Sequence, residues 1–552
     1  MKPLDETHGP VFELTRHFLA RIFDSELFAT PGQWRTVATG CLAMLLAARM
    51  ALFDMQNAAP FRRAAHPSVE AVRFMHFSSQ LAPLMLLMCV CGLLAILQWQ
   101  MLMPSRADYF ALASLPVNPR QIFTARFIAF CLFATIVVLA LNAIPALLVR
   151  APFASGIPWA LACYFPFFAI VALQGLLVNT LSGRWYARAA ATVQGVLSCA
   201  LLLGALSSFH VSQWAPDRQT LLRRFAWAPP VWFAGLEQTF HGSGEPVMHV
   251  FAARAGFAFV VSLFLAVLVY FVSYRRYRTL LLETPREAAG ARRGWNVLNL
   301  LARDPRQAAI IHFMANTLVR SRTHRLVLLA YAGSAAGILI NSVLISQAAA
   351  HWSASAASTL KFMVYYWPIV ASMIVIPGLR HVFRLPAELR ANWLFRITES
   401  QGRAQWMSAV ERVTLVYAIL PIYLVTAPAA VAVLGWSLGA RVLILQGLAS
   451  MAIFEALFYS WQQLPFACSY APGQRPVATI LGKYLATIFM AAPPLAVLIA
   501  TYSQIPATFG ILGVAFGAAW LYMRHLRRQG WGEAKLIYED SPDAMADLGL
   551  TA

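Results

Sequence analysis

The chain alternates between long apolar runs and shorter polar segments over almost its whole length. A helix needs roughly 20 apolar residues to cross the hydrocarbon of a bilayer, and about twelve runs approach that length. Their approximate limits are 36–54, 80–102, 127–149, 158–180, 189–209, 254–274, 326–346, 360–380, 413–435, 441–460, 477–499 and 508–523. The pattern therefore predicts an all-α, polytopic integral membrane protein.

One long polar stretch interrupts this alternation near the middle of the chain. It runs from Tyr274 to Arg325 and contains eleven arginines.

Each half of the chain opens with an amphipathic segment. The apolar residues are Val11, Leu14, Phe18, Ile22 and Phe23 in the first, and Ile310, Ile311, Phe313, Met314 and Leu318 in the second. We expect the first segment to lie in the membrane interface, and the second to do the same or to be a linker helix.

Two short polar islands contain a Leu-Pro pair, SLPVNPRQIFTAR (Ser114 to Arg126) and RLPAELRANWLFR (Arg384 to Arg396). When the two Leu-Pro pairs are aligned, four positions of the islands are identical. The coinciding pairs are Leu115/Leu385, Pro116/Pro386, Arg120/Arg390 and Arg126/Arg396. Each proline is expected to turn the chain into a short cytoplasmic helix. The similarity of the two islands favours a chain that arose by internal duplication, as is common in transporters.

The expected organisation is two repeated six-helix halves. Residues 1–275 form the first half and 326–525 the second, with a cytoplasmic linker at 276–325 and a C-terminal tail at 526–552. Composition supports membrane integration, because 59% of the residues are hydrophobic and only 12% are charged. These values lie far from those of soluble domains.

The net charge of +20 reflects orientation in the membrane more than a nucleic-acid partner. If the N-terminus is cytoplasmic, 32 of the 43 lysines and arginines fall in loops assigned to the inside and 10 in loops assigned to the outside. That asymmetry follows the positive-inside rule. Both termini are then cytoplasmic, in a plasma membrane of the bacterial inner-membrane type. No groove-reading module is visible, so nucleic acid is not an expected partner.

Motifs for an energy source or for catalysis are missing from the sequence. GxxxxGK[ST], HExxH and GxSxG do not occur, and no CxxC pair or histidine cluster indicates a metal site. Among residues inside apolar runs, Arg49 and Glu455 are the main charged ones, and Asn142 and Gln174 are polar. Such residues serve transport or interhelical contacts.

The islands and one external segment are the other candidate sites. Arg120 and Arg126 are expected to project from neighbouring turns beside apolar anchors, a pattern suited to docking in the groove of a partner with an acidic rim. The anchors are Ile122 and Phe123 in the first island and Leu389, Trp393 and Leu394 in the second. A solvated re-entry loop remains an alternative. Trp227, Trp232 and Phe233 fit an external gate or an aromatic belt.

ASLPVNPRQIFTARF resembles the cytoplasmic segment between the second and third spans of type 2 ABC exporter permeases. PPVWFAGLEQTFHG, followed by an apolar span ending YFVSYRRYR, is similar to their external segment and last span. LPAELRANWLFRITE and LPFACSYAPG resemble segments of double-length members.

This resemblance implies a membrane subunit without enzymatic activity of its own, joined by two separate ATPase subunits that bind ATP and Mg²⁺. Leu115 to Arg126 would contact the ATPase; in the second island Glu388 and Trp393 depart from the single-length pattern. A polytopic enzyme acting on lipid and an ion-coupled carrier are the alternatives.

Overall fold

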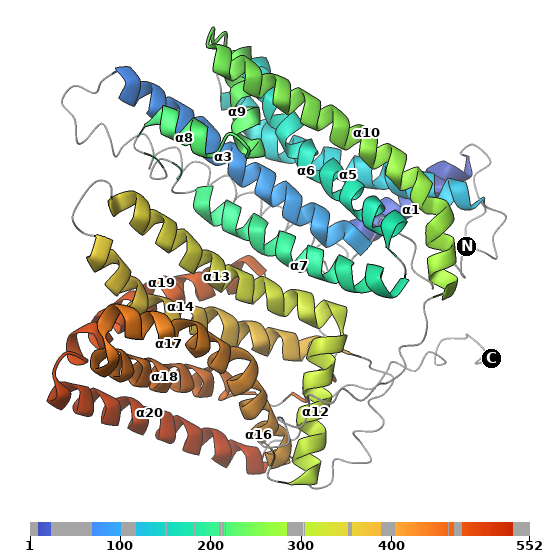
Figure 1. Ribbon diagram of the computed structural model, residues 1–552. Coiled ribbons are helices and arrows are strands. Elements are labelled where there is room, and N and C mark those ends of the chain that lie inside the picture. Colours follow the sequence, from blue (N-terminus) through green and yellow to red (C-terminus); the bar gives the residue numbers. More distant parts are fainter. Residues whose placement is uncertain are drawn as a thin grey trace, which may run out of the picture. The chain divides into compact units, whose positions relative to one another are not determined.

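The architecture of the protein is known from a computed structural model (Figure 1). It describes residues 9–23, 69–100, 118–148, 152–181, 183–208, 211, 215, 217–283, 302, 304–350, 356–387, 403–461, 463–468 and 477–533. Regular structure within these ranges is entirely helical, as expected. The chain forms two units, the first made mainly of residues up to 286 and the second mainly of the residues after it.

The first unit contains the helices up to α10. They are α1 (Pro10–Phe23), α3 (Val69–Leu97) with the short 3₁₀ helix η1 (Gln98–Gln100), α5 (Pro119–Leu148), α6 (Pro152–Thr180), α7 (Gly183–Ser207), α8 (Arg218–Arg224), α9 (Pro229–Phe240) and α10 (Pro246–Glu283). Helix α10 packs along α6 and α9, α3 packs on α6 and α7, and α1 packs on α5.

The second unit contains the remaining helices, except that residues 347–350 of α13 and 477–480 of α19 group with the first unit. They are α12 (Pro305–Arg320), α13 (Arg322–Ala350), α14 (Ala356–Arg384), α16 (Arg403–Thr414), the π-helical η6 (Leu415–Ile419), α17 (Leu420–Leu434), α18 (Trp436–Phe458), α19 (Val477–Tyr502) and α20 (Pro506–Glu533). Helix α18 packs against α14, α17 and α20, and α12 packs against α16.

Eight helices within the described ranges are long and apolar enough to cross a membrane. They lie in α3, α5, α6, α10, α14, α16 through α17, α18 and α20, and shorter apolar stretches lie in α7, α13 and α19. All expected spans except 36–54 coincide with one of these helices, and 36–54 lies outside the described residues. The apolar runs thus located helices, eight of which are long and apolar enough to span a membrane, while the count of twelve stays a prediction.

A π-helical turn joins α16 to α17. The N–H of Leu420 bonds the carbonyl of Leu415, five positions earlier instead of four. Pro421 follows directly, and a proline inside a helix has no N–H and clashes with the carbonyl four positions before it. The wider turn admits this proline without ending the helix, so residues 405–434 form one span.

Helices α13 and α14 approach closely at a glycine. A Cβ added to Gly378 would collide with Cγ of Tyr331 and would lie 2.7 Å from its Cβ. Those atoms sit near the backbone of α13 and have little freedom to move aside. Trp367 also links the pair, because its indole N–H donates to the carbonyl of Ala335 over 2.8 Å.

We expect Gly378→Ala to destabilise the second unit by about 1–3 kcal/mol through overpacking. Gly517→Ala is the matched control, because nothing lies within 4 Å of that added Cβ and alanine favours the helix of α20. Thermal unfolding of both variants in detergent measures the difference. Equal melting temperatures would contradict the close approach of α13 and α14.

Candidate functional site

The first island leads directly into a long membrane helix. Leu115 and Pro116 lie outside the described residues; helix α5 begins at Pro119. Asn118 caps it: its carbonyl accepts from the N–H of Gln121, and the Gln121 side chain accepts from the N–H of Asn118 over 3.0 Å. This reciprocal cap, with proline in the first helical position, starts a helix firmly. The prediction of a separate short cytoplasmic helix at this island is wrong, because the second half of the island forms the first turns of α5.

Most island side chains in α5 point into the protein. Ile122 and Phe123 are 7% and 6% exposed, and Arg126 is 4% exposed. The guanidinium carbon of Arg126 lies 4.3 Å from the ring centre of Phe18 in α1, and the hydroxyl of Tyr270 in α10 donates to the carbonyl of Phe123 over 3.1 Å. Arg120 is the exposed arginine of the island. The expected outward projection therefore fits Arg120 and not Arg126, Ile122 or Phe123.

The second unit repeats the docking of an amphipathic helix on the start of a later span. Gln307 in α12 accepts from the guanidinium of Arg412 in α16 over 2.7 Å and donates to the hydroxyl of Ser408. Phe313 packs edge-on against Trp406. Ile311, Met314 and Leu318 are buried. Both amphipathic segments thus exist as helices, and their apolar faces pack on protein, α1 on α5 and α12 on α16.

The second island follows a helix instead of starting one. Leu385 and Pro386 come directly after the end of α14, whereas Arg390, Trp393 and Arg396 lie outside the described residues. The structure therefore places only the first four residues of this island, Arg384 to Ala387, and the coupling role expected of Arg390, Trp393 and Arg396 stays a prediction.

The alignment of the two islands does not superpose the helices around them. When Leu385 is matched with Leu115, Val69 at the start of α3 corresponds to Leu339, which lies within α13. Arg403 at the start of α16 corresponds in the same way to Phe133, which lies within α5. The offset that matches the islands therefore does not bring equivalent helical positions together.

A short segment after α18 is bonded to the end of α14. The N–H of Phe466 donates to the carbonyl of Phe383 over 2.8 Å, and the N–H of Ala387 donates to the carbonyl of Phe466 over 3.0 Å. Phe466 has φ of 65°, which is rare for a bulky residue because of steric strain. Strain of this kind persists only where the surroundings enforce it, and it concentrates at functional sites.

Glu455 belongs to a buried network of four charged side chains. Its carboxylate lies 2.6 Å from Nε of Arg527, whose terminal nitrogen also bonds Glu411 over 2.9 Å. Arg524 completes the network at 2.7 Å from Glu411. Glu455 is fully buried and Arg527 is 3% exposed. The sequence predicts that the last span ends at residue 523, which would leave Arg527 outside it. Helix α20 instead continues to Glu533, and Arg527 is buried against neighbouring helices.

The other intramembrane candidates make contacts within and between helices. Gln174 in α6 donates to the carbonyl of Trp99 in η1 over 2.9 Å. Asn142 donates to the carbonyl of Val138 one turn earlier in α5 and lies 3.6 Å from the sulfur of Cys163 in α6. Arg49 lies outside the described residues. Gln174 thereby satisfies a carbonyl that the end of the α3 region leaves open.

The three gate candidates lie around α9. Trp227 is 71% exposed, whereas Phe233 is fully buried. The indole N–H of Trp232 donates to the carbonyl of Ala226 over 2.7 Å. Phe233 thus packs in the core, and Trp227 is the side chain placed to meet lipid or a partner.

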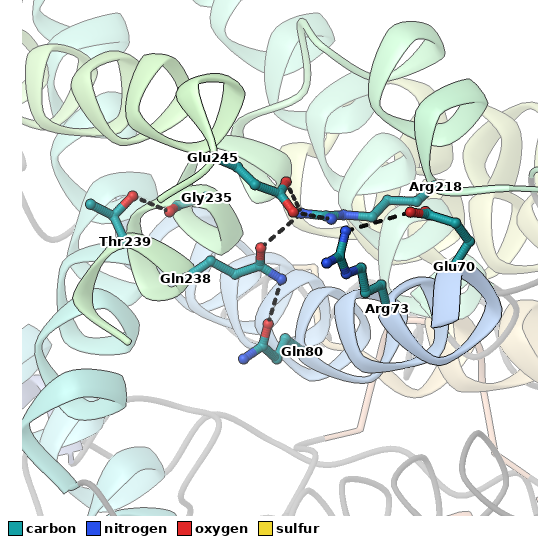
Figure 2. Close-up of polar contacts among 8 residues, drawn as sticks. All are labelled: Glu70, Arg73, Gln80, Arg218, Gly235, Gln238, Thr239 and Glu245. Atoms are coloured by element: carbon teal, nitrogen blue, oxygen red, sulfur yellow. Dashed lines mark hydrogen bonds and ion pairs between the residues drawn. The ribbon is translucent and has the colours of Figure 1, made fainter. Parts of the chain in front are cut away.

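A polar cluster that the sequence did not reveal ties α3, α8, α9 and the start of α10 together (Figure 2). Arg218 makes two parallel bonds to Glu245, of 2.9 and 2.8 Å, and a third to Gln238 over 3.0 Å. Gln238 in turn donates to Gln80 over 3.2 Å. Paired bonds between arginine and carboxylate are among the strongest polar contacts, so this cluster fixes α8 and α9 against α3 and the start of α10.

Glu245 should make stability depend on pH. Hydrogen bonds from Arg218, together with its charge, lower the pKa of Glu245 from its usual 4.5, while partial burial opposes the shift. Because the folded pKa is the lower one, the added stability is complete above 4.5 and is lost as the pH falls through the folded value.

We therefore expect wild type to melt above Glu245→Gln at neutral pH, and the difference to shrink as the pH falls below 4.5. Differential melting across a pH series measures this. A difference in melting temperature between the two proteins that stays constant down to acid pH would contradict the ion pair between Arg218 and Glu245. Asp217, whose pKa is also lowered by bonds from Thr220, is present in both proteins and cancels.

One group in the first unit superficially resembles a hydrolase site. Ser155 lies 2.8 Å from Nε2 of His241, and Glu237 lies 4.0 Å from the same nitrogen. In a catalytic triad the acid bonds the other ring nitrogen, so this arrangement does not activate the serine. Within the described part of the chain, no three His, Cys, Asp or Glu gather closely enough to hold a metal ion.

The sequence did not predict which charged residues pair with one another. Arg218, Arg527 and Glu411 stand in polar or helix-end sequence and gain their roles only when distant helices meet. No family model, curated protein or solved structure matches the chain.

Proposed function

We propose that the chain is the membrane-spanning permease of an ABC-type exporter, driven by two separate ATPase subunits that bind ATP and Mg²⁺. In this proposal twelve spans form two six-helix halves in a bacterial-type inner membrane, with both termini in the cytoplasm. Eight long apolar helices among the described residues, and the absence of a phosphate-binding loop from the sequence, support a membrane subunit that obtains its energy from a partner.

The observation that carries the proposal is the common docking of an amphipathic helix in both units. Helix α1 precedes the expected first span and packs on α5, while α12 precedes α13 and packs on α16. Each amphipathic helix is thus fastened to a later membrane span. We call each packed pair, α1 with α5 and α12 with α16, a joint. A partner that pushes on a joint at the membrane surface moves the membrane span with it, and such movement is the mechanical requirement for alternating access.

The first joint is built to transmit such a push. Arg126 stacks on Phe18 of α1, and Phe123 accepts from Tyr270 of α10, so α5 is held from two sides. Arg120 remains exposed, as does Arg16 on α1. We assign Arg120 to contact with the ATPase and the buried residues Ile122, Phe123 and Arg126 to transmission of the movement.

Purification of the tagged chain from its native membranes tests the assignment. The proposal expects an ATPase to co-purify and to hydrolyse MgATP with sensitivity to vanadate. The matched comparison is a chain carrying Arg120→Glu, which should retain less of that activity. Recovery of the full-length chain without any ATP hydrolysis would count against an ABC permease.

A further inference from the structure

Two arginines near the end of α14 face one tryptophan from the segment after α18. The guanidinium carbons of Arg380 and Arg384 lie 5.7 and 5.5 Å from the ring centre of Trp461. Arg380 also lies 6.0 Å from the ring of Phe458. Residues four apart on a helix share one face, and like charges there repel each other. The fold therefore gathers positive charge around one indole ring.

The backbone holds this group in place. Phe466 bonds the carbonyl of Phe383 and accepts from Ala387, so the segment containing Trp461 is fastened across the end of α14. His324 in α13 adds a contact of 3.0 Å to the carbonyl of Leu385. The strained φ of Phe466 belongs to the same turn. Trp461 and the arginines thus form a preorganised group rather than chance surface neighbours.

Two hydrogen-bond donors in this group have no partner among the described residues. They are Nε of Arg384 and Nε1 of Trp461. Trp461 is 4% exposed, and a buried donor without a partner costs free energy comparable to a lost hydrogen bond. No acidic side chain of the described ranges forms an ion pair with Arg384. Two unused donors beside positive charge are complementary to an anion.

We propose that Arg380, Arg384 and Trp461 bind the phosphate group of an anionic ligand, either a phospholipid headgroup or free phosphate. Guanidinium groups match phosphate oxygens with paired bonds, and the indole N–H supplies a further donor. The site lies at the end of the membrane-spanning part of α14, where phospholipid headgroups are found. The inference does not rest on the transport proposal.

Thermal shift of the full-length chain in detergent tests the site, because a ligand of the folded state raises the melting temperature. The chain is titrated with short-chain phosphatidylglycerol, with inorganic phosphate, and with short-chain phosphatidylcholine as the zwitterionic comparison. Loss of one charge-assisted bond weakens binding about tenfold or more. We therefore expect Arg384→Gln to need about tenfold more phosphatidylglycerol for the same shift.

Trp461→Phe keeps an aromatic ring and removes the indole N–H donor, so it tests the site if Arg384→Gln folds poorly. Arg441→Gln is the control, because Arg441 lies near the opposite end of α18 and bonds the carbonyl of Gln504. A response to phosphatidylglycerol alone identifies a lipid headgroup, and an equal response to phosphate identifies the free ion. An unchanged response in both site variants, or equal stabilisation by phosphatidylcholine, would overturn the proposal.

Discussion

Arg527→Met should destabilise the second unit by about 3–5 kcal/mol, the range for removal of one partner from a buried ion pair. The substitution leaves Glu455 fully buried without its cation and removes one of the two arginines that bond Glu411. It also removes the guanidinium that lies 4.8 Å from the ring of Phe454. Thermal unfolding in detergent gives the change in stability.

The neighbouring Arg528→Met provides the control for this experiment. Arg528 is exposed on the same helix, and surface substitutions usually change stability by less than about 0.5 kcal/mol. The double variant Arg527→Met/Glu455→Met should recover part of the loss, because no buried carboxylate is then left unpaired at Glu455. Equal melting of Arg527→Met and Arg528→Met would show that the network does not hold the helices together.

The network also changes the interpretation of Glu455. The sequence presents it as an isolated acid in an apolar run, which suggests a transport role. In the structure its carboxylate is engaged by Arg527, and Arg527 is shared with Glu411. Any role in binding a cation or a proton would first have to break this contact. The carboxylate is therefore better suited to fixing α18 against α20.

Arg120→Glu should lower the ATP hydrolysis that the chain stimulates about tenfold or more, while the variant chain still folds. Arg120 is exposed near the start of α5, so its side chain carries little of the core. Reversal of a charge at an interface places like charges together, which costs several kcal/mol, and about 1.4 kcal/mol corresponds to a tenfold change. Steady-state MgATP hydrolysis by the purified complex measures the effect.

Arg223→Glu is the comparison variant for coupling. Arg223 is likewise exposed, in α8 of the first unit, and lies outside the α1–α5 joint. We expect this variant to hydrolyse ATP as wild type does. Loss of activity in both variants would indicate a general effect of negative charge, and retention in both would remove Arg120 from the coupling surface.

Hydrophobic patterning predicted the helices because the bilayer imposes their length and composition. The described helices cover the expected spans after 36–54, and α1 and α12 appear where one-sided apolar patterns were found. The start of α5 was misplaced, since Pro119 and not Pro116 occupies the first helical position behind the Asn118 cap. The local sequence thus predicted which segments form helices better than it predicted the residues at which they begin.

Pairings between distant residues lay beyond such patterns. Arg527 meets Glu411 and Glu455 only because α16, α18 and α20 pack together. The offset that aligns the two islands pairs the start of α3 with the interior of α13, so it does not align the described helices. A match between letters at a fixed spacing does not establish equivalent places in a fold.

We propose that this chain is the membrane half of an ATP-driven transporter. The most direct test of this proposal is MgATP hydrolysis by the co-purified ATPase in proteoliposomes, with and without the chain. We expect the chain to stimulate hydrolysis, with stimulation that saturates at two ATPase subunits per chain and requires Arg120. Hydrolysis that is the same in the presence and absence of the chain would contradict it.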